Sequence, residues 1–485
     1  MRESSLKALS SQVFDLLIIG GGITGAGIAR DAALRGLSVA LIDKGDFASG
    51  TSSRSSRLIH GGVRYLEHGH LHLVFEAQAE RRRLLRVAPH LVQPLAFTWP
   101  VYRGQRLALW KLSAGLTLYD ILSLFRNVKR HRTLGAREVL ELEPNLRRDT
   151  MRGGVRYYDA ATNDSRLTLA NVLDAQSLGA VVANYVTFGA GAASRDGHRI
   201  ATVEDVLTHQ AFEIRARAFV NATGPWSDDV RRMESGAKKN RVQGSKGAHI
   251  AVPRNRIGNR DAITMLHPRD GRVMFALPAG SNAIIGTTDT FTDVSPDEVR
   301  ASETDVAYLL DAANAFFPGA RLQRDDVIAA WAGIRPLMPT NKSERAASRE
   351  HSIDRRDGSV TITGGKLTTF RVMAAQVVDV AQRVVGRASN GASTQTRPLP
   401  KSEPPTTGDA IAAGLPYRMD AMRWCVEHEL ACTLGDLLIR RTHVAYETRD
   451  NGRAAARAVA TALGWGSDQV ERYDAEAKRI FAIDP

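Results

Sequence analysis

IIGGGITGAGIA, residues 18–29, lies between an apolar run, Phe14–Ile19, and a stretch of helical composition, Ala26–Arg35. Three of its glycines match a dinucleotide-binding fingerprint: Gly20, Gly22 and Gly25. The first allows a tight turn, the second lets the backbone approach a pyrophosphate, and the third lets the helix pack closely on the strand. Because the glycines fall in a strand-to-helix turn, the stretch predicts a Rossmann-like dinucleotide site.

An acidic residue follows at the expected place. Leu37–Ile42 predicts the next parallel strand, and Asp43 at its end lies 23 residues after Gly20. A carboxylate at that position can bind a pair of ribose hydroxyls. The agreement of strand, helix and acidic residue favours a cofactor site over an ordinary glycine-rich turn, but the motif does not distinguish FAD from NAD.

The composition of the 485 residues is that of a globular protein of two or three domains, with 43% hydrophobic and 24% charged residues. No run approaches the ~18 apolar residues of a membrane span, and residues 1–12 lack the apolar core of a signal peptide. Cys425 and Cys432 lie in a segment of helical composition, where seven residues rise about 10.5 Å, too far for a disulfide. We therefore expect a cytoplasmic or peripheral protein in a reducing compartment.

A formal net charge of +13 indicates an anionic partner, which the charge alone leaves open among a phosphorylated substrate, acidic lipid and nucleic acid. The Leu-rich stretch 107–125 is flanked by basic residues that include Arg103 and Arg126. It is either a buried core helix or an interfacial helix on anionic lipid. No basic stripe with interleaved aromatic residues is present, which argues against a main role in RNA binding.

The rest of the chain predicts three kinds of segment. A polar run, Ser49–Ser56, follows Asp43, and Leu71–Val87 predicts a surface helix that ends before Pro89. Several short apolar runs predict strands, most of them in a separate antiparallel sheet: 218–224, 250–252, 273–277 and 283–289. Residues 360–371 predict a strand, a glycine turn and the beginning of a helix. A proline-rich linker at 388–408 then precedes helical stretches at 419–441 and 452–463.

Two of these segments resemble the signatures of FAD-dependent glycerol-3-phosphate dehydrogenases: residues 19–36 are similar to the first signature and residues 364–374 to the second. Five further stretches are similar, in the family's order: Ser52–Glu67, Asn221–Trp226, Lys246–Ile250, Gly286–Asp289 and Gly333–Leu337. The chain departs in having Phe370 where the family usually has tyrosine, and in a shorter C-terminal region. It has no cysteine cluster for an iron–sulfur centre, and we predict no metal site.

The resemblance implies an α/β fold. It has an FAD-binding Rossmann-like domain of the glutathione-reductase/D-amino-acid-oxidase type, an antiparallel-sheet substrate domain and a small C-terminal helical cap. We place the FAD-binding domain at 12–95, 155–235 and 325–388. The substrate domain is placed at 96–154 and 236–324, and the C-terminal helical domain at 400–485.

Oxidation of a phosphorylated alcohol by a flavin needs a proton acceptor, positive charge near the flavin N1 and O2, and cations for the phosphate. His60, beside two glycines, is the predicted proton acceptor, although it could instead only hold its loop. The predicted phosphate ligands are Arg64, Arg335, the Tyr65 hydroxyl and, more weakly, Lys246. Lys366 completes the catalytic set beside the flavin.

The remaining cofactor contacts are carried over by position. Backbone amides of Gly365, Leu367 and Thr368 would stabilise negative charge on the flavin. The other predicted FAD contacts are Thr51, Ser52 and Ser56 along the pyrophosphate and flavin, the Val186 backbone at the adenine, and Ala222, Thr223 and Gly224 on the far side. Thr288 and Asp289 are interpreted as structural.

The resemblance implies oxidation of sn-glycerol 3-phosphate to dihydroxyacetone phosphate, with electrons passed from FAD to a membrane quinone. From the Leu-rich stretch and the net charge we expect a peripheral protein on the inner face of the cell membrane that contacts anionic lipid. We expect no nucleic-acid partner, and a homodimer is one option. Two alternatives stay open: an oxidase that uses oxygen, and an FAD amine or amino-acid oxidoreductase in which His60, Arg64 and Arg335 bind a carboxylate.

Overall fold

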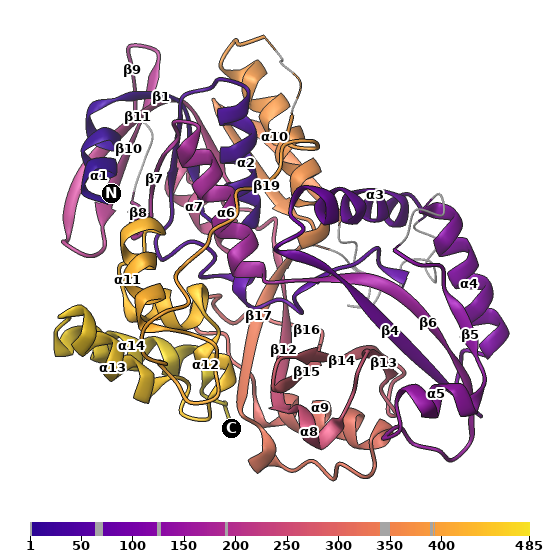
Figure 1. Ribbon diagram of the computed structural model, residues 1–485. Helices are drawn as coiled ribbons and strands as arrows, with labels where there is room; N and C mark the ends of the chain where they lie inside the picture. The colour runs from indigo at the N-terminus through magenta and orange to yellow at the C-terminus, as the bar shows by residue number, and fades with distance from the viewer. Residues whose placement is uncertain are drawn as a thin grey trace.

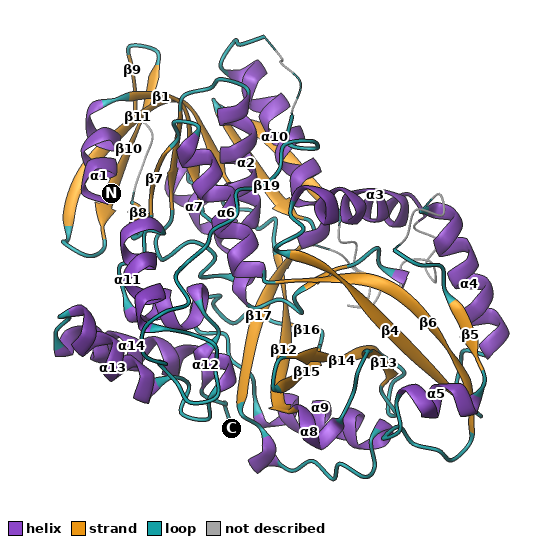
Figure 2. Cartoon of the chain, in the orientation of Figure 1, coloured by secondary structure: helices purple, strands orange, loops and turns teal. Residues whose placement is uncertain are grey.

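The computed structural model describes residues 2–63, 71–123, 128–189, 193–339, 350–388, 391 and 393–485. Two β-sheets and a group of C-terminal helices make up this part of the chain (Figures 1 and 2). Its α-helices are α1 (Arg2–Ser11), α2 (Ile23–Leu34), α3 (Leu71–Val87), α4 (Leu109–Leu122), α5 (Ala136–Leu142), α6 (Asp164–Ser177), α7 (Ser227–Ser235), α8 (Arg254–Ile257), α9 (Glu303–Phe316), α10 (Phe370–Val384), α11 (Met419–His428), α12 (Val444–Glu447), α13 (Arg453–Leu463) and α14 (Ser467–Phe481). None of the described helices is long and apolar enough to cross a bilayer.

The first sheet has a parallel centre in the order β19-β11-β1-β2-β7. Its strands are β1 (Val13–Ile19), β2 (Val39–Ile42), β7 (Val181–Ala183), β8 (Val186–Phe188), β9 (Ala193–Arg195), β10 (His198–Asp205), β11 (Gln210–Asn221), β18 (His351–Arg356) and β19 (Ser359–Gly364). Both faces of β1 are covered: Leu16 and Ile18 pack in the core beneath α2, α6 and α10, whereas Leu17 and Ile19 pack on the opposite side. This arrangement explains why β1 reads as an unbroken apolar run.

The second sheet is mainly antiparallel and is ordered β16-β12-β15-β14-β13-β4-β6-β3, with β17 on β12 and β5 on β6. Its strands are β3 (Leu58–Ile59), β4 (Val92–Tyr102), β5 (Arg132–Leu134), β6 (Met151–Thr162), β12 (Gln243–Pro253), β13 (Ala262–Leu266), β14 (Val273–Ala279), β15 (Asn282–Gly286), β16 (Thr290–Phe291) and β17 (Ala329–Leu337). Apolar residues of α9 form one core with this sheet. Apolar residues of α4 and of the C-terminal helices share a second core with its strands.

The predicted fold class is confirmed, and so is the helix at Leu71–Val87. The sheets divide the chain differently from the predicted domain ranges, however. The predicted boundaries at 95/96 and 154/155 fall inside β4 and β6, which pair with each other along their length. β17, placed with the FAD-binding domain from sequence, pairs with β12 of the second sheet. Strand pairing between distant segments, which local composition does not report, causes these differences.

Helix α4, in the described part of the Leu-rich stretch, has a buried face and an exposed face that carries apolar residues. Leu112, Leu116 and Tyr119 are buried in the core of the second sheet. Trp110 is 69% exposed and Ile121 is 46% exposed on the outer face. In Figure 1, α3 and α4 lie at the edge of the molecule away from the C-terminal helices α11–α14.

Candidate active site

A cavity of about 560 Å³ is lined by residues of both sheets and of the loops between them. One part is formed by the first glycine turn, Asp43 and Val186 of the first sheet. The other part is formed by aromatic residues of the second sheet, such as Trp99 and Tyr157, and by the second glycine turn. The lining of the cavity therefore differs between its two parts. The first is rich in glycine backbone, and the second carries aromatic and cationic side chains.

The first glycine turn brings β1 and α2 into close contact. Gly20 has φ +104°, which favours glycine, and a Cβ on Gly25 would lie 1.8 Å from the Gly20 carbonyl oxygen. Gly20 and Gly22 line the cavity, whereas Gly25 does not and serves this packing contact. Gly22 offers no side chain to cap the start of α2, although the Ser52 hydroxyl accepts the Ile23 amide there. The positive end of α2 thus begins at the cavity wall, where an anion can bind.

Asp43 lies at the end of β2 and lines the cavity. Its Oδ2 accepts a hydrogen bond from the Gly21 amide at 2.6 Å, and its Oδ1 accepts one from Gly45 at 2.8 Å. Burial raises its pKa to about 6, although the two amides oppose that shift. Each carboxylate oxygen retains a further lone pair, so the residue can still accept a ribose hydroxyl.

Residues 43–57, here called the cofactor loop, connect β2 to β3 and contribute much of the cavity wall. Ser52 Oγ accepts the Ile23 amide at 2.9 Å, which joins the loop to the start of α2. Thr51 Oγ1 donates to the Ile334 carbonyl at 2.7 Å, and Ser56 Oγ lies 2.9 Å from His249 Nε2. The three predicted hydroxyls therefore line the cavity while holding the loop to its neighbours.

Two further predicted segments reach the same wall. Ala222 and Thr223 follow β11, and the Ala222 amide donates to the Ile19 carbonyl at 2.9 Å. Gly224 has φ +56° and also lines the cavity. Val186 enters it at the start of β8, where its amide is bonded to the Asp43 carbonyl at 2.8 Å. Its carbonyl and side chain, not its amide, are therefore available to a ligand.

The second glycine turn lies between β19 and α10. Gly364 and Gly365 have φ +81° and +98°, and a Cβ on Gly364 would lie 2.3 Å from the Glu350 carbonyl oxygen. The Gly365 amide already donates to that carbonyl at 3.3 Å. Among the predicted backbone donors, Gly365 is thus partly engaged, while Leu367 and Thr368 form the first turn before α10 and line the cavity.

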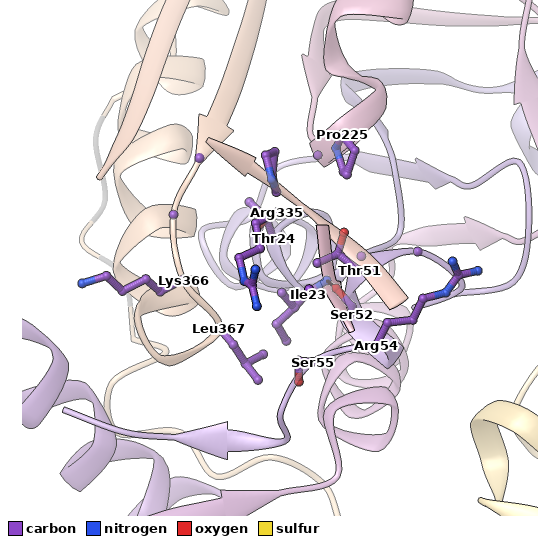
Figure 3. A pocket seen from close by; sticks show the side chains of 18 of the residues that line it. Ile23, Thr24, Thr51, Ser52, Arg54, Ser55, Pro225, Arg335, Lys366 and Leu367 are labelled. Atoms are coloured by element: carbon purple, nitrogen blue, oxygen red, sulfur yellow. Dashed lines mark hydrogen bonds between the residues drawn. The ribbon is translucent and has the colours of Figure 1, made fainter. Parts of the chain in front are cut away.

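The two glycine signatures touch each other. Phe370, at the start of α10, is 2% exposed, and a Cβ on Gly27 of α2 would lie 2.9 Å from its ring. The ring fills the contact between α2 and α10, a place where a tyrosine hydroxyl would have little water around it. Figure 3 shows Lys366 extending from this turn, and Arg54 extending from the cofactor loop to the opposite side of Ile23 and Ser52.

His60 lines the cavity on a turn whose backbone is held from two sides. The Thr368 hydroxyl accepts from the His60 amide and donates to the His60 carbonyl, both at 3.2 Å. The next amide, Gly61, donates to Asp159 Oδ1 at 3.1 Å. Asp159 is itself buried and accepts from Tyr119 and Arg81.

Arg335 of β17 lines the cavity and is oriented by three groups on the 287–289 segment. Its guanidinium donates to Thr287 Oγ1 at 2.8 Å, to the Thr288 carbonyl at 3.2 Å and to Asp289 Oδ1 at 3.2 Å. A Cβ on Gly247 would lie 2.2 Å from the same guanidinium. Asp289 therefore acts as the structural partner of Arg335, and the glycine makes room for it.

Lys246 lies elsewhere. It is not among the cavity-lining residues, and its ammonium forms a 2.6 Å ion pair with Asp305 of α9. In a β-strand, successive side chains point to opposite faces of the sheet. Gly247 and His249 line the cavity, so the Lys246 side chain points to the other face of the sheet. This geometry argues against the predicted role of Lys246 in substrate binding. Arg64 and Tyr65 lie outside the described residues.

The sequence reasoning did not select three cavity-lining side chains: Arg54, Asp159 and His249. Burial, then Arg335 and Arg57, lower the pKa of His249 to about 3, so its imidazole is neutral at physiological pH. Its Nδ1 is buried and has no hydrogen-bond partner within the described part of the chain. Burial also lowers the pKa of Arg54 to about 10, and this guanidinium stays charged. The family-like stretch 246–250 was the available signal for His249.

The residues fit a dinucleotide with a redox-active ring. The start of α2, where Gly22 adds no side chain, suits a pyrophosphate. The aromatic part of the cavity suits a flat ring, and the helix start before α10 lies there to stabilise negative charge on that ring. The unpartnered His249 Nδ1 offers a hydrogen bond to a bound group at the same end. Imidazoles and guanidiniums in this part can move a proton and bind an anion.

Comparisons with known proteins agree with this geometry. Residues 15–380 match the model of FAD dependent oxidoreductases, and residues 370–469 match that of the C-terminal domain of alpha-glycerophosphate oxidase. The chain is 35% identical over 529 aligned positions to a glycerol-3-phosphate dehydrogenase of Synechocystis sp., covering 96% of this chain and 95% of the relative. It is 37% identical to the aerobic glycerol-3-phosphate dehydrogenase of Staphylococcus haemolyticus, covering 78% of this chain and 69% of the relative.

Solved structures show the same fold. The glycerol-3-phosphate dehydrogenase from Bacillus halodurans complexed with FAD superposes with a TM-score of 0.78 and 29% identity, covering 99% of this chain and 97% of the other. The FAD-bound L-alpha-glycerophosphate oxidase of Mycoplasma pneumoniae superposes with a TM-score of 0.61 at 17% identity, covering 81% of this chain and 100% of the other. The second likeness concerns the fold alone.

Proposed function

The chain belongs to the FAD-dependent glycerol-3-phosphate dehydrogenase family, and from that premise we propose that it oxidises sn-glycerol 3-phosphate to dihydroxyacetone phosphate. The observation that carries this proposal is that Arg335 lines the same cavity as His60 and the second glycine turn. A guanidinium can bind the two negative charges of a phosphate with paired hydrogen bonds. FAD, when bound, supplies the hydride acceptor.

In this proposal, His60 takes the proton of the substrate hydroxyl. Its backbone is fixed through Thr368 and, one residue on, through Asp159, so its imidazole has a defined starting position. His249 is the second imidazole of the cavity, but a pKa near 3 makes it a weak proton acceptor at neutral pH. We assign His249 to hydrogen bonding and alignment, held by Ser56 and by stacking on Trp331.

Lys366 and the first turn before α10 would stabilise negative charge on the flavin ring of bound FAD. The helix start places backbone dipoles and, at Lys366, a positive charge beside the cavity. Both favour a ring that becomes negative on reduction. Aromatic side chains of the second sheet, such as Phe97 and Phe275, exclude water from the same part and strengthen these interactions.

Anaerobic mixing with candidate substrates tests the reaction. Glycerol 3-phosphate should bleach the flavin absorbance, while glycerol, which lacks the phosphate, and glycine or proline should not. An amino acid that bleaches the flavin when glycerol 3-phosphate does not would overturn the proposal in favour of the amine or amino-acid alternative.

The quinone acceptor that we propose is tested on the reduced enzyme. A soluble quinone analogue should reoxidise the flavin faster than air-saturated buffer does. Rapid peroxide formation in air would favour the oxidase.

Replacing Arg335 tests the phosphate contact. Arg335→Ala should raise the KM for glycerol 3-phosphate by about 10- to 100-fold, the range expected for loss of a charged hydrogen-bond pair. Arg335→Lys should be intermediate, because a lysine keeps the charge but loses the paired donors. Arg137→Ala is the matched control, since Arg137 is 92% exposed on α5. An unchanged KM in Arg335→Ala would contradict the assignment.

We also propose that the outer face of α3 and α4 contacts an anionic membrane. Leu71 and Phe75 of α3 are 44% and 45% exposed, and Trp110 and Ile121 of α4 present further apolar area. A small basic hollow of about 150 Å³ lies nearby, lined by Lys129, Arg130, Arg132, Arg156 and Tyr158. Apolar side chains bordered by cations suit the interface of an anionic bilayer.

Co-sedimentation with vesicles tests this contact. The wild type should bind vesicles of phosphatidylglycerol at low salt and release at high salt, and should bind phosphatidylcholine vesicles weakly. Trp110→Ser with Ile121→Ser should reduce binding at least tenfold. Val294→Ser is the control, because Val294 is 49% exposed outside this face. Equal binding by the double variant and the control would contradict the proposal.

A further inference from the structure

The C-terminal helices touch the cofactor loop at three separated points, although no described residue after Met373 lines the cavity. The points on the loop are Asp46, Ser53 and Arg57. We propose that the C-terminal helices hold the cofactor loop in its FAD-binding shape, so that this domain is a positioning element of the FAD site.

Asp46 is the first contact and is completely buried. Arg440 Nε donates to its Oδ2 at 2.7 Å, and Arg441 Nη1 donates to the same oxygen at 2.5 Å. Asn184 adds a third donor at 3.0 Å. Burial alone would raise the pKa of Asp46, but the two guanidiniums lower it, so the carboxylate stays ionised and bound.

The two arginines are themselves fixed. They end a π-helical turn, Asp436–Arg441, which is a rare geometry that changes the direction of successive side chains. Arg440 also donates to Asp436 and to Glu476 of α14, both at 2.7 Å. The cations therefore reach the loop from a rigid base, and a carboxylate displaced from them would lose its buried partners.

The second and third contacts come from the next segment of the C-terminal domain. The Tyr446 hydroxyl donates to the Ser53 carbonyl at 3.0 Å, and Ser53 is adjacent to Ser52, which accepts from the start of α2. His443 Nδ1 lies 3.2 Å from Arg57 Nη1, and the Arg57 guanidinium lies over the Tyr446 ring at 4.8 Å. The loop is thus held on the side away from the cavity, near the residues that line it.

A loop that already has its binding shape before the cofactor arrives binds it more tightly, because no further conformational entropy of the loop is lost on binding. The coupling is reciprocal: if the C-terminal contacts favour FAD binding, FAD must stabilise those contacts by the same free energy. Both directions can be measured without any substrate. Their outcome is therefore independent of the reaction proposed above.

A matched pair of tyrosine variants tests the inference. Tyr446→Phe removes the hydroxyl that bonds the Ser53 carbonyl. Tyr473→Phe removes a buried hydroxyl that bonds the Asn451 carbonyl at 2.5 Å, within the C-terminal domain and away from the loop. We expect Tyr446→Phe to raise the FAD dissociation constant of the full chain about fivefold and to speed FAD release, and Tyr473→Phe to leave both unchanged. Equal FAD affinities in Tyr446→Phe and the wild type, or equal weakening in both variants, would overturn the proposal.

Two further measurements keep the inference testable if Tyr446→Phe fails to fold. Asp46→Asn should raise the FAD dissociation constant more than Tyr446→Phe does, because it removes the charge bound by both arginines. In the wild type, removal of FAD should speed hydrogen exchange of amides at 436–447 and leave α13 unchanged. Identical exchange at 436–447 with and without FAD would overturn the proposal.

Discussion

The imidazole of His249 is enclosed between the Trp331 ring, whose centroid lies 5.6 Å away, and Gly286, where a Cβ would lie 2.2 Å from the imidazole. Enclosure removes the water that would stabilise its protonated form, and the positive charges of Arg335 and Arg57 act in the same direction. The same cause, burial, raises the pKa of Asp43. At single residues, burial therefore sets which protonation state the site presents.

His249 should make the protein sensitive to acid. Its pKa is about 3 in the folded state against an ordinary value of 6.5, so the unfolded state binds a proton that the folded state lacks between those values. Stability should fall as the pH falls through this window, by about 2 kcal/mol between pH 7.5 and pH 5 from this group. Urea unfolding of His249→Gln at the two pH values should show a loss smaller by that amount. An equal loss in the variant and the wild type would contradict the assignment.

Helix α4 links the molecular surface to the site. Its inner residue Tyr119 donates to both oxygens of Asp159, at 2.9 and 3.1 Å. Asp159 also accepts the Gly61 amide beside His60. One helix thus carries exposed apolar residues on its outer face and, on its inner face, a hydrogen bond to Asp159, which in turn holds the turn of His60. Because the buried and the exposed residues lie on different faces, the burial of one face leaves the other accessible for the membrane contact that we propose.

Tyr119→Phe should therefore affect both stability and turnover. Loss of a hydrogen bond to a carboxylate costs about 1.5–3 kcal/mol, and a shift of the Gly61 backbone should lower kcat. Tyr102→Phe is the control: its hydroxyl is buried with no partner within the described chain, so its removal should be neutral or stabilising. Denaturant unfolding and steady-state kinetics check this prediction. An unchanged kcat in Tyr119→Phe would show that the contact does not set the position of His60.

The whole molecule is arranged so that the FAD site as a whole does not belong to one sheet alone. The chain passes repeatedly between the two sheets, and the cavity takes its walls from both. The C-terminal helices pack on the second sheet through Tyr446 and Trp331, and they bind the cofactor loop through Asp46. In Figure 1 these helices lie beside both the first sheet and β17. The parts should therefore lose their structure together.

Thermal unfolding tests this cooperativity. We expect tryptophan fluorescence and flavin release to change in one coincident transition. FAD at 100 times its dissociation constant should stabilise that transition by about 2.7 kcal/mol. Two separate transitions, with flavin retained in the first, would show that the C-terminal helices unfold independently of the site.

Much of the FAD site was predictable because its requirements are local. The tight turn at Gly20, the strand before it and the carboxylate at Asp43 lie within one strand–helix–strand stretch, and the turn needs the positive φ that glycine adopts readily. The helix at Leu71–Val87 was predicted for the same reason, from the spacing of its apolar residues. The predicted helical stretch 419–441 was wrong in detail, since α11 ends at His428, before Cys432.

The glycine turns and the helix starts that suit a dinucleotide can be read from the amino-acid sequence, because adjacent residues are sufficient to build them. Three other features arise from the packing of distant segments: Lys246 pairs with Asp305, His249 is buried in the cavity wall, and Arg440 binds Asp46, 394 positions away. Such pairs depend on which distant surfaces pack together and lose their water. The free energy of a charge then depends on its buried partners, and local sequence does not name them.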